Sequence, residues 1–321
     1  MRCFAISHKY NQQTSKTILC ALRLHFLNSL HNLIRMICFP NAKINLGLRV
    51  LRKRTDGYHD IESVFYPVPL RDVLEVDLLQ PHFNGTCFLE MTGSKRLFYS
   101  YSGALVVDDP ENELTAKAIR AYDKAFGIST DVFIHLHKQI PSGAGLGGGS
   151  SDASFALRAI NTLEGDKVDM ASLMNLAASI GSDCPFFILN EPCLAEGKGG
   201  ILKPIPISFS GYHLVLVKPA FGVSTAEAYS RVVPKHDPNE PSLMDVINMP
   251  LESWSGSLVN DFEKGVFELY PQLAEIKKSL YDAGALYASM SGSGSTIFGL
   301  FKNEPILNDL FRDCFIFKSK L

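Results

Sequence analysis

The sequence predicts a fold that combines strands with helices in two domains. An apolar strand at residues 132–136 leads through a glycine-rich segment into a helix whose apolar residues repeat at helical spacing. An alternating strand at 42–50 precedes them, and a second set, the strand 213–217 and the helix 271–282, follows in the last third of the chain. A chain of 321 residues with 46% hydrophobic residues can bury one large core or two modest ones.

The glycine-rich segment at residues 141–154 reads Pro-Ser-Gly-Ala-Gly-Leu-Gly-Gly-Gly-Ser-Ser-Asp-Ala-Ser. Glycine lets the backbone approach a ligand closely and adopt positive φ angles. The helix that follows presents free N–H groups and about half a positive charge at its N-terminus. Ser150 or Ser151 is expected to cap that helix, which leaves the other hydroxyl for a phosphate oxygen or a metal ion. The segment therefore predicts a polyphosphate-binding loop.

Three other interpretations of this segment are less consistent with the sequence. It is no Walker A loop, because no Lys-Ser/Thr pair follows the glycines. Residues 143–148 match the dinucleotide pattern Gly-x-Gly-x-x-Gly, but the acids that should follow a second strand, Glu164 and Asp166, lie in a turn before a helical segment at 170–180. A flexible linker is disfavoured because a strand precedes the segment and a patterned helix follows it.

The alternating strand at 42–50 places Lys43 and Asn45 on one face and apolar residues on the other. Taken alone, a lysine on a strand face is usually solvated. The pair acquires a functional interpretation only together with the motifs that follow.

A turn at residues 54–59 contains Asp-Gly, a hairpin signal, followed by Tyr58 and His59. Taken alone, two such residues beyond a turn are usually edge residues of a hairpin.

A helix at 171–180 is expected to end at Gly181. Asp183 then lies in a short loop before an apolar strand predicted at 185–189. Taken alone, this aspartate would satisfy N–H groups of the turn.

The four motifs follow each other along the chain in the order Lys43-x-Asn45, the turn at 54–59, the glycine-rich segment and the loop with Asp183. In this order they resemble the motifs of the GHMP small-molecule kinases, which include galactokinase, homoserine kinase and mevalonate kinase. The triple glycine with Ser-Ser and the Asp-Gly-Tyr-His turn are most similar to the branch that acts on 4-diphosphocytidyl-2-C-methyl-D-erythritol. The resemblance covers nearly all of residues 36–301. It implies an α+β fold with two lobes and an active site in the cleft between them.

The resemblance implies ATP-dependent phosphorylation of the 2-hydroxyl of that acceptor, a step of non-mevalonate isoprenoid synthesis. Lys43 would polarise the hydroxyl, and Asp183 would take its proton as the catalytic base. Asn45 would contact the substrate, Tyr58 would stack on the cytosine ring, and His59 would bond the polar edge of the ring. The ATP phosphates would lie on Pro141, Gly143, Gly145, Gly147, Gly148, Gly149, Ser150 and Ser151.

Two further segments fit the family. The Ser/Gly run at 289–295 resembles the glycine turn that closes near the phosphates. The segment 220–229 resembles the one that supplies a second aromatic ring against the base, with Phe221 and Tyr229 as candidates and Tyr229 preferred.

A magnesium ion is expected with the nucleotide, and Ser151 is its expected protein contact. Asn112 and Lys138 are further candidates for contacts with the nucleotide, although exposed loop positions are the simpler explanation for both.

Composition limits the classes of partner. The formal net charge of −2 provides no electrostatic footprint for nucleic acid, and polar residues interrupt the apolar stretch at 18–34, so it predicts no membrane span. Seven cysteines without a Cys-x-x-Cys pair predict reduced thiols in a cytoplasmic compartment and argue against zinc or a disulfide framework. We therefore expect a small-molecule substrate as partner, and monomer and homodimer both stay open.

Residues 1–35 contain five Lys or Arg and no Asp or Glu. Such a basic leader has two interpretations, an organellar targeting peptide or an upstream start codon with Met36 as the true first residue, and we favour the second. We expect an N-terminal ATP-binding domain at 36–196 and a C-terminal domain at 197–321. Within the latter, residues 234–250 are predicted to form a surface excursion.

Two other functions stay open. A GHMP kinase for another acceptor, such as homoserine or a mevalonate, would have no need of the turn with Tyr58 and His59, because neither compound contains a pyrimidine. A catalytically silent nucleotide-binding regulator would have no need of both Lys43 and Asp183.

Overall fold

The computed structural model describes residues 35–78, 88–91, 95–103, 113–234, 240–307 and 310–321. The expected leader lies outside these residues except for Arg35, and Asn112 lies outside them as well. The described residues form three β-sheets with helices between them along the chain, as the α+β prediction requires.

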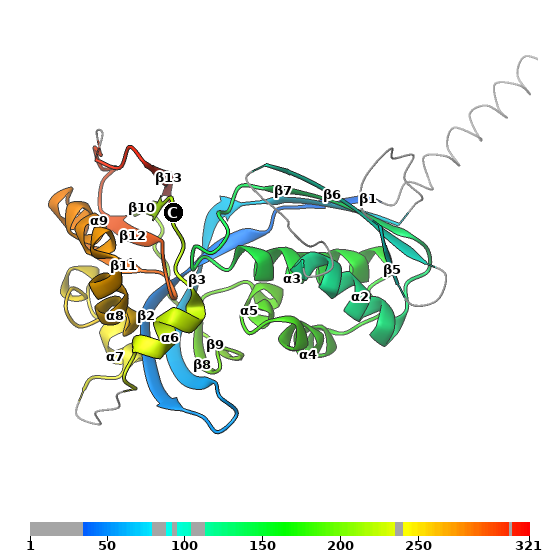
Figure 1. Cartoon of the computed structure of the whole chain (residues 1–321), viewed down its shortest axis with the longest axis horizontal. Helices are drawn as coiled ribbons and strands as arrows, with labels where there is room; N and C mark the ends of the chain where they lie inside the picture. The colour runs from blue at the N-terminus through cyan, green and yellow to red at the C-terminus, as the bar shows by residue number, and fades with distance from the viewer. Residues whose placement is uncertain (1–34, 79–87, 92–94, 104–112, 235–239, 308–309) are drawn as a thin grey trace, which may run out of the picture.

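Helices cover one face of the first sheet: two of them lie against the sheet, and the third packs on those two (Figure 1). Its strand order is β1 (Arg35–Cys38), β4 (Val73–Asp77), β7 (Val132–Lys138), β6 (Arg96–Gly103), β5 (Phe88–Glu90), and its helices are α2 (Leu114–Phe126), α3 (Gly148–Leu163) and α4 (Met170–Ile180). β6 and β7 run parallel, and the other neighbours are antiparallel. Alternate strand residues such as Leu74, Ile134 and Leu136 are buried in the core beneath the helices.

The second sheet is built on a long hairpin. Its order is β2 (Asn41–Lys53), β3 (His59–Arg71), β8 (Cys193–Gly197), β9 (Ile201–Pro204). All neighbouring strands are antiparallel. The turn that joins the first two strands carries the Asp-Gly signal, so the expected hairpin is confirmed.

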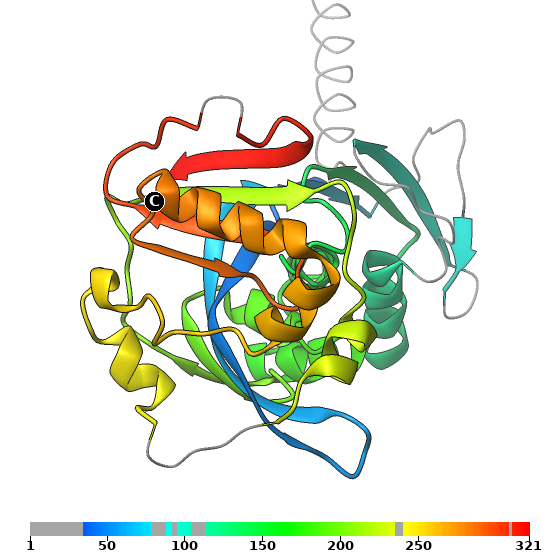
Figure 2. The ribbon, with the colours of Figure 1, turned by 60° about the vertical axis from the view of Figure 1, so that its left-hand side comes forward.

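The third sheet is covered on both faces. Its order is β11 (Tyr287–Met290), β12 (Ile297–Phe301), β10 (His213–Pro219), β13 (Cys314–Lys320), with α8 (Phe262–Leu269) and α9 (Pro271–Asp282) on one face (Figure 2). Leu214 and Leu216 of β10 pack with residues of the long hairpin, whereas Val215 and Val217 pack beneath these two helices. Successive residues of β10 therefore point in turn into the core shared with the long hairpin and into the core beneath the two helices.

Shorter helices complete the described chain: α5 (Cys184–Leu189), α6 (Thr225–Arg231), α7 (Leu243–Ile247) and the 3₁₀ helix η1 (Leu251–Ser253). None of the helices in the described part of the chain combines the length and apolar character that a membrane crossing requires.

Three local predictions are wrong. The segment 185–189 is the helix α5 and not a strand, because a short apolar run does not distinguish the two and Pro185 suits a first helical turn. Neither Ser150 nor Ser151 caps α3, because that helix already begins at Gly148. The excursion expected at 234–250 contains α7, which a capping box starts and whose apolar residues are buried.

The expected boundary between residues 196 and 197 falls inside β8, which pairs with β3 of the first domain. The division of the chain into two domains at this point stays a prediction. The four described cysteines are free, and burial raises the pKa of the Cys184 thiol to about 11, so this residue packs and is not a reactive thiolate. The cytoplasmic location also stays a prediction.

Candidate active site

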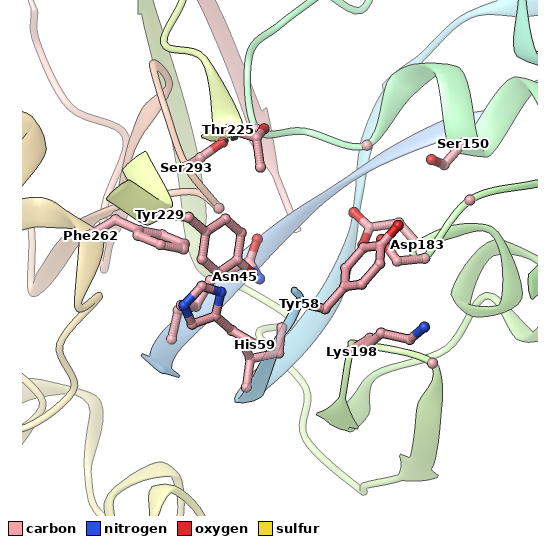
Figure 3. Close-up of a pocket in the computed structure, with 18 of the residues that line it drawn as sticks. Asn45, Tyr58, His59, Ser150, Asp183, Lys198, Thr225, Tyr229, Phe262 and Ser293 are labelled. Atoms are coloured by element: carbon pink, nitrogen blue, oxygen red, sulfur yellow. Dashed lines mark hydrogen bonds between the residues drawn. The ribbon is translucent and has the colours of Figure 1, made fainter. Parts of the chain in front are cut away.

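A cavity of about 1180 Å³ opens where the long hairpin, the glycine segment and the turns that follow α4 and β11 meet (Figure 3). Its lining includes most of the predicted site residues: Lys43, Asn45, Tyr58, His59, Gly143, Gly145, Gly147, Ser150, Asp183 and Tyr229. The other predicted residues, Pro141, Gly148, Gly149 and Ser151, lie outside this lining. The fold thus brings residues from all four motifs to one cavity.

Lys43 and Asp183 form an ion pair in this cavity, with 3.3 Å between Lys43 Nζ and Asp183 Oδ2. Lys43 is only 3% exposed. Its ammonium group donates a hydrogen bond of 2.6 Å to Asn45 Oδ1 and lies 4.4 Å from the centre of the Phe65 ring. This lysine is therefore held among a carboxylate, an amide oxygen and a ring face, unlike a solvated lysine on a strand.

Two helices set the position of Asp183. α4 ends with Gly181 as its C-cap residue, as predicted, and Asp183 is the N-cap residue of α5. The aspartate therefore lies at a sharp junction between two helices, where its side chain is 28% exposed and reaches the cavity.

Two glycines of the segment lie so close to neighbouring residues that a Cβ atom would not fit at either position. Gly145 has a φ of 73°, and a Cβ at this position would overlap the carbonyl oxygen of Ser291 in the turn between β11 and β12. In return, the Ser291 hydroxyl donates a hydrogen bond of 2.8 Å to the Gly145 carbonyl. Gly147, the N-cap residue of α3, has a φ of 70° and would place a Cβ 2.9 Å from the Phe187 ring. Direct contacts therefore fix the shape of the segment.

The two adjacent serines of α3 differ in their access to the cavity. Ser150 lines it, whereas Ser151 is fully buried and its hydroxyl has no hydrogen-bond partner among the described residues. The expected metal contact of Ser151 stays a prediction. Within the described residues, no group of three or more His, Cys, Asp or Glu side chains could hold a metal ion.

The aromatic residues of the cavity lie in two places. The His59 and Tyr229 rings are stacked, with centroids 4.7 Å apart and an angle of 18° between their planes. Tyr58 lies apart from this pair, across the opening (Figure 3), and is 61% exposed. Burial and the charge of Asp183 raise the pKa of Tyr229, so its hydroxyl stays protonated at neutral pH.

Phe221, the other candidate for the second aromatic ring, lies outside the cavity lining. Its ring stacks on Tyr270 with centroids 5.1 Å apart. Lys138 is also occupied elsewhere, because its ammonium group forms ion pairs with the buried carboxylates of Asp72 and Asp152. The expected contact between Lys138 and the nucleotide stays a prediction, and it would compete with these two ion pairs.

Three parts of the cavity were not predicted from the sequence. Phe65 lies on the same face of β3 as His59. Because every second residue of a strand faces the same side, counting from His59 could have identified it. Lys198, whose Nζ lies 4.6 Å from the centre of the Tyr58 ring, comes from a glycine-rich turn with no motif. The hydroxyls of Thr225 and Ser293 are 3.1 Å apart in the wall of the cavity. They belong to the two segments 220–229 and 289–295 that the sequence assigned to the site, but no local pattern shows that these two residues meet.

Comparison with known proteins agrees with this geometry. The N-terminal domain of GHMP kinases matches residues 113–191, and the GHMP kinase C-terminal domain matches residues 247–313. The 4-diphosphocytidyl-2-C-methyl-D-erythritol kinase of Parabacteroides distasonis is 46% identical over 288 residues, which cover 89% of this chain and 100% of the relative. The chain belongs to the GHMP kinase family. The kinase of the same name from Thermodesulfovibrio yellowstonii is 39% identical over 84% of this chain and 90% of that relative.

Solved structures of GHMP kinases show the same fold. A crystal structure of 4-(cytidine 5'-diphospho)-2C-methyl-D-erythritol kinase superimposes with a TM-score of 0.66 at 33% identity, over 83% of this chain and 90% of that chain. Homoserine kinase from Cytophaga hutchinsonii has a TM-score of 0.56 at 16% identity, over 87% of this chain and 94% of that chain. The second likeness concerns the fold alone. Together these findings confirm the predicted family and fold class.

Proposed function

We propose that this GHMP kinase transfers the γ-phosphoryl group of ATP to the 2-hydroxyl of 4-diphosphocytidyl-2-C-methyl-D-erythritol. The observation that carries the proposal is one cavity in which the Lys43–Asp183 pair, the glycine segment and the stacked His59–Tyr229 pair all take part. Relatives that carry this activity in their names are 39–46% identical over most of the chain.

The transfer needs a base and a fixed cation. The acceptor oxygen attacks the γ-phosphorus while its proton passes to the Asp183 carboxylate. As the new O–P bond forms, the bond from the γ-phosphorus to the bridging oxygen breaks, and ADP leaves with that electron pair. Lys43 holds the carboxylate and the acceptor oxygen in place and offsets the developing negative charge.

The phosphate side would be formed by the glycine segment and the N-terminus of α3, whose first N–H groups suit phosphate oxygens. Mg²⁺ bound to the phosphates would reduce the negative charge on the leaving group. Magnesium takes one or two ligands from protein and the remainder from phosphates and water. This preference fits the site, because Ser150 brings one hydroxyl oxygen to the cavity beside the phosphate loop.

The pyrimidine side would lie between Tyr58 and the stacked pair. The base would take the place of the His59 ring against the face of Tyr229, a ring that also packs against Phe262 with centroids 4.8 Å apart. The edge of His59 would then bond the polar edge of the base. Acceptors without a base would leave these rings unused, which favours the cytidylyl acceptor over homoserine or mevalonate.

An ADP-release assay on the full chain with ATP and Mg²⁺ tests the proposal. It compares 4-diphosphocytidyl-2-C-methyl-D-erythritol with homoserine, mevalonate and galactose as acceptors. We expect turnover with the cytidylyl compound alone. Turnover with another acceptor would reject the pyrimidine assignment, and no turnover with any acceptor would favour the silent regulator.

A further inference from the structure

Ser63 of β3 takes part in the hydrogen-bond network of the site without reaching the cavity. The side chains of His59, Ile61 and Phe65 lie on the same strand at a period of two and line the cavity. Ser63 belongs to this row, but it is fully buried. Its hydroxyl lies 2.9 Å from Asn45 Nδ2 and 2.6 Å from the Gly47 carbonyl oxygen.

The donors and acceptors in this network leave only one arrangement. The Lys43 ammonium can only donate, so the Asn45 atom 2.6 Å away must be the amide oxygen. The Asn45 amide nitrogen therefore faces Ser63. The single proton of Ser63 goes to the Gly47 carbonyl, which can only accept, so the serine oxygen is free to accept from Asn45. Each group fixes the next.

We propose that Ser63 is a positioning residue for phosphoryl transfer: its hydroxyl fixes the amide of Asn45 so that the amide oxygen faces the Lys43 ammonium. The proposal rests on the kinase function proposed above. Without the hydroxyl, the Asn45 amide can turn over and present its NH₂ group to the ammonium. Two donors would then face each other, and Lys43 would move away from Asp183.

The expected consequence is a slower chemical step. Phosphoryl transfer depends on the alignment of acceptor oxygen, base and cation, and small displacements of reacting groups have large effects on rate. The two hydrogen bonds of Ser63 described above join it to Asn45 and Gly47, and neither involves the glycine segment that would form the phosphate side. We therefore expect the KM for ATP to change much less than kcat.

The pair Ser63→Thr and Ser63→Val tests the role of the hydroxyl. The two side chains have nearly the same shape and both suit a strand, so any strain in the buried site is common to them. We expect Ser63→Val to lower kcat at least tenfold relative to Ser63→Thr, with KM for ATP within twofold in both. Equal kcat values in the two variants would overturn the proposal. Ser100→Val is the matched control, because Ser100 is a buried strand serine bonded to His135 in another sheet.

A double-mutant cycle separates positioning from a general structural effect. If Ser63 acts only through the amide, Ser63→Val should lower kcat less than twofold in an Asn45→Ala background. The same tenfold loss in that background would contradict the proposal.

A measurement without turnover keeps the proposal separate from the proposed function. By NMR, the side-chain amide protons of Asn45 should exchange slowly with solvent in the unchanged protein and in Ser63→Thr, and at least tenfold faster in Ser63→Val. If the unchanged chain fails to phosphorylate the cytidylyl acceptor, the proposed function fails, while these exchange rates still decide the role of Ser63. Equal exchange in all three proteins would reject it.

Discussion

The phosphate side and the pyrimidine side of the cavity are built in different ways. On the phosphate side, backbone meets backbone: Gly145 contacts the turn at Ser291 with no room for a side chain. On the pyrimidine side, aromatic side chains form the surface. Tyr58 comes from a hairpin turn and Tyr229 from a helix, and the two are far apart in the sequence. The first surface is formed by close contacts of the backbone, whereas the second depends on single side chains.

This difference indicates which part of the site all members of the family can share and which part distinguishes one branch by its acceptor. Any nucleoside triphosphate donor needs the same phosphate surface, so the backbone can supply it. An acceptor is distinguished by its own groups, which only side chains can recognise. Substitutions on the two sides should therefore alter different kinetic constants, and substitutions of the reacting pair should alter neither binding constant.

The largest effect is expected for Asp183→Asn, which removes the base and retains its shape. We expect kcat to fall at least ~10²-fold, because an amide cannot take the acceptor proton. The dissociation constants of ATP and acceptor should stay within about threefold, since Asp183 belongs to neither binding surface. Single-turnover kinetics and calorimetric titration measure the two quantities.

A kcat for Asp183→Asn close to that of the unchanged protein would remove Asp183 from the mechanism. Ser182→Ala is the control, because Ser182 also lines the cavity beside this aspartate and has no assigned role. A similar loss of kcat in both variants would mean that the turn, and not the carboxylate, is required.

Gly145→Ala should have the next largest effect, and it acts on the phosphate side. The added methyl group requires the Ser291 turn to shift, and the positive φ costs a further ~1–2 kcal/mol for a residue with a Cβ. We expect the dissociation constant of ATP to rise about tenfold or more, measured by calorimetry, with a smaller change for the acceptor.

Gly127→Ala is the matched control for this substitution. Gly127 has a φ of 72°, as Gly145 has 73°, but a Cβ there would have no neighbour within 4 Å. Both variants should lose thermal stability through the φ angle, and only Gly145→Ala should lose affinity for ATP. Equal ATP affinities in the two would show that the close contact does not shape the phosphate surface.

The sequence predicted the phosphate side better than the pyrimidine side, for a physical reason. The glycines and the start of α3 follow each other directly in the sequence, and the strand with Lys43 shows its own alternation, so local spacing indicates the geometry of each. The helix at Cys184–Leu189 was missed because a short apolar run suits strand and helix alike. The stacking of His59 on Tyr229 and the contact of Lys198 with Tyr58 depend on how distant segments pack, so no local pattern reports them. Sequence alone cannot tell which of the two adjacent helical residues Ser150 and Ser151 lines a cavity.

On the pyrimidine side, Tyr229→Ala should raise the KM for the cytidylyl acceptor. Stacking of a base on an aromatic ring contributes about 1–3 kcal/mol, which corresponds to a rise of roughly 5–160-fold. The KM for ATP should stay within about twofold. Tyr229→Phe retains the ring and should behave like the unchanged protein, so steady-state kinetics of the two variants isolate the ring. Equal effects on both substrates would place Tyr229 outside the pyrimidine surface.

The smallest effect is expected for Tyr58→Ala. Tyr58 is 61% exposed, and Lys198 already lies over its ring, so a base would gain less there than against the packed Tyr229 ring. We expect the KM for the acceptor to rise about three- to tenfold, with no change for ATP, in the same steady-state assay. The two tyrosines would contact opposite faces of one base, so their effects should not be independent. We expect the KM of the double variant for the acceptor to be at least that of Tyr229→Ala and to rise by less than the product of the two single effects. A larger effect at Tyr58 than at Tyr229 would reverse the ranking, and the exposed turn, not the packed helix, would then be the main determinant of acceptor specificity.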